Sequence, residues 1–173
     1  DYALIKYKKL AGGGYFKIIN QSVPGALRRL GYKPDEIKDI VEYCVGTGSL
    51  ESAPYINRNS LRQKGFTDEV LDNIQLELPK VFDISFAFNK FVMGERFCKD
   101  VLKLTDEQLN SMDFSLLGHL GFTEEEIQVS NDSICGRMTV ENAPHLKERH
   151  YPVFDCANQC GKHGKRFIRP EAH

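Results

Sequence analysis

The stretch LGYKPDEI at residues 30–37 returns at residues 120–127 as LGFTEEEI, and this repetition decides the fold. In both copies a glycine precedes an aromatic residue, acidic residues and an isoleucine. Glycine adopts the left-handed backbone conformation that ends many helices without steric strain. Each copy therefore predicts the end of one helix, a tight turn and the start of a second helix.

The repetition extends beyond these two stretches. GTGSLESAPYI at 46–56 corresponds to GRMTVENAPHL at 136–146, and a partial copy, KGFTDEVL, lies at 64–71. Each full copy ends in Glu-x-Ala-Pro, where the proline keeps the preceding alanine out of helical geometry. The sequence predicts a mainly α fold of short helical hairpins with internal duplication, in repeat units at about 22–56, 60–103 and 112–146.

Apolar periodicity and capping residues predict where the helices lie. Apolar residues recur at helical spacing in 34–45, 67–78 and 87–102, although Gly94 lowers the propensity of the third by about 1 kcal/mol. Thr67 is a natural N-cap. The pairs Thr105 with Gln108 and Thr123 with Glu126 form capping boxes, which mark two further helix starts.

Extended structure is expected at both ends of the chain. Strands are predicted at 15–20, 150–157 and 165–169, and the glycines of AGGGYFK at 11–17 form a turn rather than a P-loop. The expected organisation is an extended segment at 1–21, a helical insertion domain at 22–147 and an extended return segment at 148–173. Such an arrangement is typical of an insertion that leaves and re-enters a host domain.

Length, charge and cysteine content narrow the classes of function. At 173 residues the chain has the size of one ordinary domain. With 23 basic and 24 acidic residues, the whole molecule carries no electric field that would attract nucleic acid or an anionic membrane. The helices also begin with acidic residues, which would repel DNA phosphates and so disfavour a DNA-binding helix-turn-helix. No apolar run approaches the roughly 20 residues of a membrane span. Five cysteines, an odd number, favour a reducing cytoplasm, and the first residue, Asp1, indicates a fragment or a processed product.

The stretch APHLKERHYPVFDCANQCGKHGKRFIRPEAH near the C-terminus gathers candidate ligands. Cys156, Cys160 and His163 provide thiolate and imidazole groups suited to zinc, with His145, His150 or Cys135 as a possible fourth ligand. The alternative is that the cysteines are reduced and structural. The spacing of the two cysteines differs from that of a dithiol redox motif.

The same stretch holds a cluster of basic residues. Lys162, Lys165, Arg166 and Arg169 surround two glycines, and such a loop is able to cradle a phosphate, although an ordinary solvated turn has the same pattern. No catalytic motif is recognisable in the chain. His119, on an apolar stripe, is predicted to be a core histidine.

Four stretches carry a resemblance to a known family: YFKIINQSVPGALRRLGY, ESAPYI, FDISFAFNKFVMGERFC and NDSICGRMTVENAPHLKERHYPVFDCANQCGKHGKRFI. In this order they resemble one internal section of the large adenosylcobalamin-dependent, or class II, ribonucleotide reductases. The resemblance runs from about Tyr7 to His173. Because those enzymes are several times longer, it implies that this chain is a segment of one.

The resemblance implies a function for the parent protein rather than for the segment. The family reduces ribonucleotides to deoxyribonucleotides for DNA synthesis by radical chemistry, with adenosylcobalamin as cofactor and a thiyl radical in a ten-stranded α/β barrel. The family's Asn-x-Cys-x-Glu radical motif does not occur here. The expected segment is thus a helical insertion into that barrel without catalytic residues, and its partners are the rest of the reductase chain, the ribonucleotide substrate and cobalamin.

Two other hypotheses compete with this one. The chain could be an independent helical module that binds a phosphate-bearing ligand through its C-terminal basic loop. It could also be an interaction module stabilised by zinc at Cys156, Cys160 and His163.

Overall fold

The N-terminal strands pair as an antiparallel hairpin. A computed structural model describes residues 3–169 and 171. Strand β1 (Ile5–Lys9) pairs with β2 (Tyr15–Ile19), so that Ile5 lies opposite Ile19 and Lys9 opposite Tyr15. Gly13 and Gly14 have positive φ angles in the connecting turn. The predicted strand at 15–20 and the predicted turn at the glycines of the 11–17 stretch are confirmed. Strand β1 was not predicted, because its sequence, IKYKK, is largely charged and exposed.

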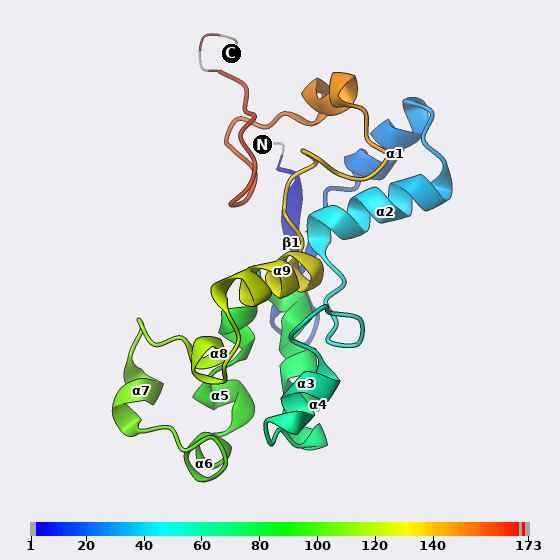
Figure 1. The fold of residues 1–173 in the computed structure, drawn as a ribbon. Helices are drawn as coiled ribbons and strands as arrows, with labels where there is room; N and C mark the ends of the chain where they lie inside the picture. Colours follow the sequence, from blue (N-terminus) through cyan, green and yellow to red (C-terminus); the bar gives the residue numbers. More distant parts are fainter. Residues whose placement is uncertain (1–2, 170, 172–173) are drawn as a thin grey trace. The chain divides into compact units, whose positions relative to one another are not determined.

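The chain divides into two compact units (Figure 1). Unit 1 combines the residues up to Thr47 with those from Gly136 onward, and unit 2 comprises 48–135. Each unit has a separate hydrophobic core. The two units are distinguished by the contacts within each of them. That the segment 22–147 is an insertion domain stays a prediction.

Unit 1 contains the hairpin, two helices and a 3-10 helix. Helix α1 (Ser22–Arg29) leads through Gly31, at φ 93°, into α2 (Pro34–Val45), with Pro34 in the first helical turn. The 3-10 helix η3 spans Glu148–Phe154. The core of the unit joins residues from both ends of the chain: Leu4, Ile19, Val23, Leu27, Tyr32, Ile37, Ile40, Cys44, Val140, Ala143, Leu146, Phe154 and Cys156.

The two crossings of the chain between the units lie side by side within unit 1. The amide of Arg137 donates to the carbonyl of Tyr43, and that of Met138 donates to the carbonyl of Cys44, both at 2.9 Å. A Cβ atom on Gly136 would lie 2.5 Å from the nitrogen of Gly46. The segment 48–135 therefore leaves unit 1 and returns to it at nearly the same point.

Unit 2 is built of short helices. In chain order these are α3 (Arg58–Gln63), α4 (Asp68–Glu77), the 3-10 helices η1 (Leu78–Lys80) and η2 (Ile84–Ala87), α5 (Lys90–Met93), α6 (Glu95–Asp100), α7 (Asp106–Asn110), α8 (Leu116–His119) and α9 (Glu124–Cys135). The caps predicted at Thr67, Thr105 and Thr123 are confirmed by hydrogen bonds from backbone amides to their hydroxyl groups. The prediction of a mostly helical fold is likewise confirmed.

Four local predictions are wrong. Gly94, at φ 89°, divides the expected helix at 87–102 into α5 and α6, since a left-handed residue cannot continue a right-handed helix. The expected strand at 150–157 is mostly the 3-10 helix η3, and 165–169 forms no strand. His119 is exposed at the end of α8 and contacts the ring of Phe114, so it is not a core residue.

Local structure agrees at the corresponding positions of the sequence repeat. Helices α2 and α9 each span 12 residues. The glycines before them, Gly31 and Gly121, have φ angles of 93° and 98°, and those after them, Gly46 and Gly136, have 86° and 78°. The glycine turns read from the sequence are thus confirmed, while their origin by duplication stays a prediction.

Candidate functional site

The basic residues of the C-terminal loop are partly engaged within unit 1. The guanidinium of Arg166 donates from Nε and Nη2 to the two carboxylate oxygens of Asp155, at 2.9 and 2.8 Å. The hydrogen bonds that Arg166 donates to Asp155 raise the pKa of Arg166. The backbone amide of Lys165 donates to the carboxylate of Glu141 at 2.6 Å. The fork of Arg166 that would hold a phosphate is therefore already occupied by a carboxylate.

The two cysteines of the predicted metal site lie close together, and the thiol of Cys156 donates a hydrogen bond to the carbonyl of Phe154 at 3.6 Å. Both line a cavity of about 380 Å³ with residues of the N-terminal segment, Leu4 and Ile5 among them. Burial, followed by the contact with Cys156, raises the pKa of Cys160 to about 12. Burial also raises the pKa of Cys44 to about 12. Without a bound metal, the thiols of Cys44 and Cys160 are therefore protonated at neutral pH.

His163 lies half-buried in the turn after Gly161. Within residues 3–169 and 171, no group of three or more His, Cys, Asp or Glu side chains is arranged to hold a metal ion. The zinc prediction for Cys156, Cys160 and His163 and the phosphate prediction for Lys162, Lys165, Arg166 and Arg169 both stay predictions.

Two other histidines of the stretch have side-chain partners. The ring of His150 is 2.6 Å from the hydroxyl of Tyr32, and this hydroxyl also accepts a bond from the amide of Lys147. His145 lies 2.8 Å from the carboxylate of Asp39. Tyr32 lies just before α2 and Asp39 lies within it. The two histidines therefore help to hold the C-terminal stretch against this part of unit 1.

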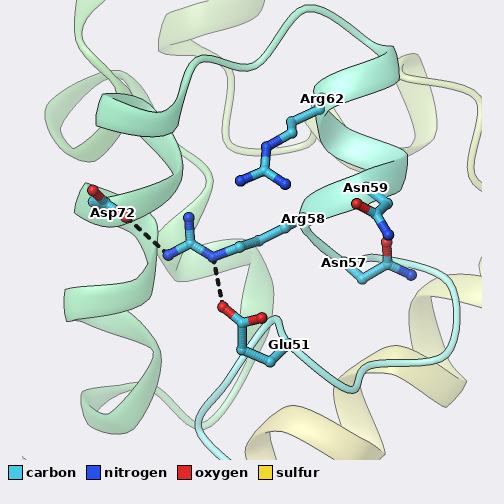
Figure 2. Close-up of a pocket in the computed structure, with 6 residues that line it drawn as sticks. All are labelled: Glu51, Asn57, Arg58, Asn59, Arg62 and Asp72. Carbon is cyan, nitrogen blue, oxygen red and sulfur yellow. Dashed lines mark hydrogen bonds and ion pairs between the residues drawn. The ribbon is translucent and has the colours of Figure 1, made fainter.

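A polar pocket of about 350 Å³ opens in unit 2 between α3 and α4 (Figure 2). Arg58, from the first turn of α3, extends across it, and its Nη2 lies 2.9 Å from Asp72 of α4. Its Nε lies 2.9 Å from the carboxylate of Glu51, a distance that makes an ion pair, in an orientation that leaves the N–H without an aligned hydrogen bond. Asn57, Asn59 and Arg62 complete the lining.

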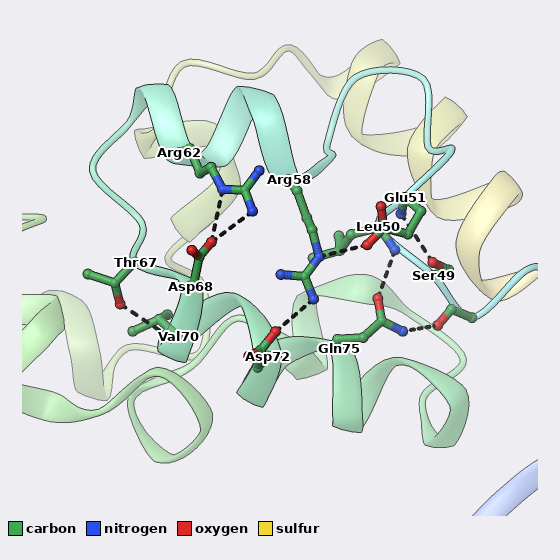
Figure 3. A network of polar contacts seen from close by, with 11 residues as sticks. Ser49, Leu50, Glu51, Arg58, Arg62, Thr67, Asp68, Val70, Asp72 and Gln75 are labelled. Atoms are coloured by element: carbon green, nitrogen blue, oxygen red, sulfur yellow. Dashed lines mark hydrogen bonds and ion pairs between the residues drawn. The ribbon is translucent and has the colours of Figure 1, made fainter.

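The pocket belongs to a network that holds α3 to α4 (Figure 3). Arg62, one turn after Arg58, donates from Nε and Nη2 to Asp68. Gln75 of α4 accepts a bond from the amide of Leu50 and donates to the carbonyl of Gly48. Three carboxylates surround two guanidinium groups, so the pocket carries no excess positive charge for an anion. Its charges compensate one another and join α3, α4 and the 48–51 loop.

Sequence reasoning missed this network although a signal was present. Arg58 and Arg62 are four residues apart, and so are Asp68 and Asp72 on the next helix. Residues at this spacing share one face of a helix, so two complementary faces were readable in a helical hairpin. The spacing indicates a pairing of helices rather than a ligand.

The comparisons with known proteins place these observations in a longer chain. No protein-family model matches the sequence. Vitamin B12-dependent ribonucleotide reductases from Bradyrhizobium diazoefficiens and Agrobacterium fabrum are 57% and 53% identical to it over all 173 residues. A reductase of the same description from Streptomyces clavuligerus is 52% identical over 54 residues. This chain spans 14% of the length of the first two relatives.

The chain is thus similar over its whole length to one segment of a much larger enzyme. That enzyme is the vitamin B12-dependent ribonucleotide reductase, and the resemblance stated from the sequence is confirmed. No helix in the described part of the chain is long and apolar enough to cross a membrane.

By themselves, the two pockets described above are small for the cofactor in the relatives' name. Pockets for drug-sized ligands have volumes of about 300–1,000 Å³, and a corrinoid is larger than such a ligand. The polar pocket is crossed by Arg58, and the cavity beside Cys156 and Cys160 measures about 380 Å³. No chemical step is therefore assigned to these side chains.

Proposed function

We propose that this chain is a structural segment of a vitamin B12-dependent ribonucleotide reductase, an enzyme that converts ribonucleotides to deoxyribonucleotides for DNA synthesis. The match over the full length of the chain to 14% of two such reductases carries the proposal. In this proposal the segment is a helical insertion in the larger chain. The ribonucleotide and adenosylcobalamin bind to the parent enzyme, and the radical cysteine lies outside the segment.

The chemistry of the described side chains supports a role without catalysis. Arg58, Arg62 and Arg166 are paired with carboxylates of the same unit. The thiols of Cys44 and Cys160 are held in their protonated form by burial. Ion pairs therefore engage the three arginines, and the two protonated thiols are poor nucleophiles.

The experiment compares the 173-residue chain with the full-length protein from the same source. Each is incubated with adenosylcobalamin, a ribonucleotide and a dithiol reductant, and the deoxyribonucleotide formed is measured by chromatography. We expect turnover by the full-length protein that depends on adenosylcobalamin, and none by the 173-residue chain.

Two results would contradict the proposal. Turnover by the 173-residue chain alone would show that the segment is itself catalytic. A full-length protein that reduces no ribonucleotide with adenosylcobalamin would show that the parent has another function. The diphosphate and the triphosphate of the same nucleoside are both tested, so that the choice of substrate does not decide the outcome.

A further inference from the structure

A groove of about 650 Å³ runs along unit 2 between α4 and the pair α5 and α6. Its apolar lining comes from all three helices and the residue after α6: Val70, Phe91, Val92, Met93, Phe97 and Val101. We call this surface the phenylalanine groove. The side chain of Phe97 packs edge-on against Phe66 in the core of the unit, at 5.1 Å between ring centroids. The floor of the groove is thereby joined to the rigid core.

Phe91, on the wall of this groove, is 88% exposed. Its backbone is held in place, because Asn89 caps α5 by accepting hydrogen bonds from the amides of Phe91 and Val92 at 2.9 and 3.1 Å. The ammonium of Lys90 lies 5.3 Å from the centre of the Phe91 ring and bonds to Asn110. The ring is therefore presented to the outside by a well-formed helix start.

An exposed phenylalanine lacks the stabilisation that burial of its side chain would provide. Burying such a side chain is worth about 1.5–3 kcal/mol. Val101, in the same groove, is 44% exposed. Exposed apolar surface with a polar rim is characteristic of contact sites, and aromatic residues are the usual anchors of such contacts. Glu69, Arg96 and Asp100 form the charged part of the rim.

We infer that the phenylalanine groove is the surface on which the rest of the reductase chain, outside residues 1–173, packs against this segment. This inference rests on the proposed function. The two relatives that match the whole chain are about seven times longer than it, so most of the parent polypeptide is available as an occupant. A segment of the same polypeptide is also present at high effective concentration, which a separate partner is not.

The groove specifies the chemistry of the occupant. A volume of about 650 Å³ accepts more than one large apolar side chain beside Phe91. The rim carries Glu69 and Asp100 against the single cation Arg96, whose distance to Asp100 is 3.8 Å. An apolar stretch with a lysine or arginine beside it is complementary to this rim.

The test uses photo-crosslinking in the full-length reductase. The substitution Phe91→p-benzoylphenylalanine places a light-activated group of similar shape in the groove. After irradiation and proteolysis, mass spectrometry identifies the peptide joined to position 91. We expect a peptide of the same chain from outside residues 1–173, and a several-fold lower yield when Val101→Glu is added.

Two further arms make the result decisive. Met112→p-benzoylphenylalanine is the matched control, because Met112 is 100% exposed and does not line the groove. A yield at position 91 no greater than at 112 would overturn the inference. So would a crosslink between two chains, seen as a doubled mass under denaturing conditions, or one confined to residues 1–173.

The activity of the same preparations separates this inference from the proposed function. If the unmodified full-length protein reduces ribonucleotides with adenosylcobalamin but position 91 gives no crosslink to the rest of the chain, the function stands and the groove inference is wrong. If it reduces none, the function is wrong whatever position 91 contacts.

Discussion

Gly136 occupies a crowded backbone position where the chain returns to unit 1. Its φ angle is 78°, and a Cβ atom there would meet the carbonyl oxygen of Cys44 at 2.3 Å and the nitrogen of Gly46 at 2.5 Å. Both neighbours are backbone atoms, which cannot move aside by rotating a side chain. Two separate reasons therefore require glycine here: its positive φ angle, and the close approach of the backbone at Cys44 and Gly46.

Substitution of this glycine is expected to destabilise the chain strongly. We expect Gly136→Ala to lower the free energy of unfolding by about 3 kcal/mol or more, because the new methyl group forces two backbone segments apart. Gly25→Ala is the matched control: Gly25 lies in α1 with nothing within 4 Å of the added atom, and alanine there is expected to gain about 0.5–1 kcal/mol. Urea denaturation followed by circular dichroism measures both changes. Equal effects of the two substitutions would contradict this account.

The buried thiols predict a dependence on alkaline pH. Burial raises the pKa of Cys44 and Cys160 to about 12 from an ordinary value of 9.0. The unfolded chain therefore releases these protons at a lower pH than the folded chain does. Their contribution to stability is fully present below about pH 9 and is lost as the pH rises toward about 12.

Alkylation by iodoacetamide checks this prediction directly. At pH 8 a thiol with a pKa of about 12 is a thiolate in about one molecule in ten thousand, and Cys44 is also completely buried, so modification of Cys44 and Cys160 in the folded chain is expected to be slow. Between pH 8 and 10 the rate should rise about tenfold per unit. Peptide mapping follows each cysteine, with the urea-unfolded chain as control. Rapid modification at pH 7, equal to that of the unfolded chain, would show that these thiols are not held protonated.

At the scale of the secondary-structure element, α9 supports two loops with buried polar side chains. Ser130 accepts a hydrogen bond from the amide of Ile56 at 3.1 Å, and Asn131 accepts one from the amide of Ile84 at 2.9 Å. Both side chains are buried, although Ser and Asn are usually exposed. They satisfy amide groups that the surrounding loops leave without a backbone partner.

Removal of one such acceptor is expected to be costly. Asn131→Ala leaves the amide of Ile84 buried and unbonded, so we expect a loss of about 1–3 kcal/mol in the free energy of unfolding. Asn110→Ala removes the exposed bond to Lys90 and should change stability by about 0.5 kcal/mol or less. Denaturation curves of the two variants give the comparison. A loss for Asn131→Ala as small as that for Asn110→Ala would mean that water replaces the amide side chain.

Elements with a local signal were predictable from the sequence, and elements decided by distant contacts were not. The glycine turns, the threonine caps and helices α2 and α9 follow from residues a few positions apart. The division at Gly94 depended on the glycine taking a positive φ angle, which the apolar periodicity around it does not reveal. Helix η3 is held by Tyr32, whose hydroxyl contacts Lys147 and His150, more than a hundred residues away along the chain.

Contacts in the candidate site were likewise hard to predict from the sequence. The sequence placed Asp155 and Arg166 in one short stretch but gave no sign that they pair with each other. The proximity of Cys156 and Cys160 followed from their spacing. Their approach to Cys44, whose pKa Cys160 also raises, depends on the packing of the return segment against α2.

At the scale of the whole molecule, unit 2 is inserted into unit 1 at one point. The core residues of unit 1 all lie before Thr47 or after Gly136, and those of unit 2 all lie between 50 and 135. We expect a variant in which a short glycine–serine linker replaces 48–135 to retain a folded unit 1, because the two ends to be joined already touch. A cooperative thermal transition by circular dichroism is the expected result. A chain that unfolds gradually, without a transition, would show that unit 1 depends on unit 2.

The adjacency of Gly46 and Gly136 also fixes an order of events during synthesis. The N-terminal hairpin, α1 and α2 leave the ribosome first, but the residues that complete their core, such as Val140 and Phe154, follow only after unit 2 has been made. Unit 2 carries its whole core in one continuous stretch, so it is able to fold as soon as it emerges. Until then, the N-terminal part of unit 1 has apolar side chains that lack their packing partners. During this interval the nascent chain is most prone to misassembly.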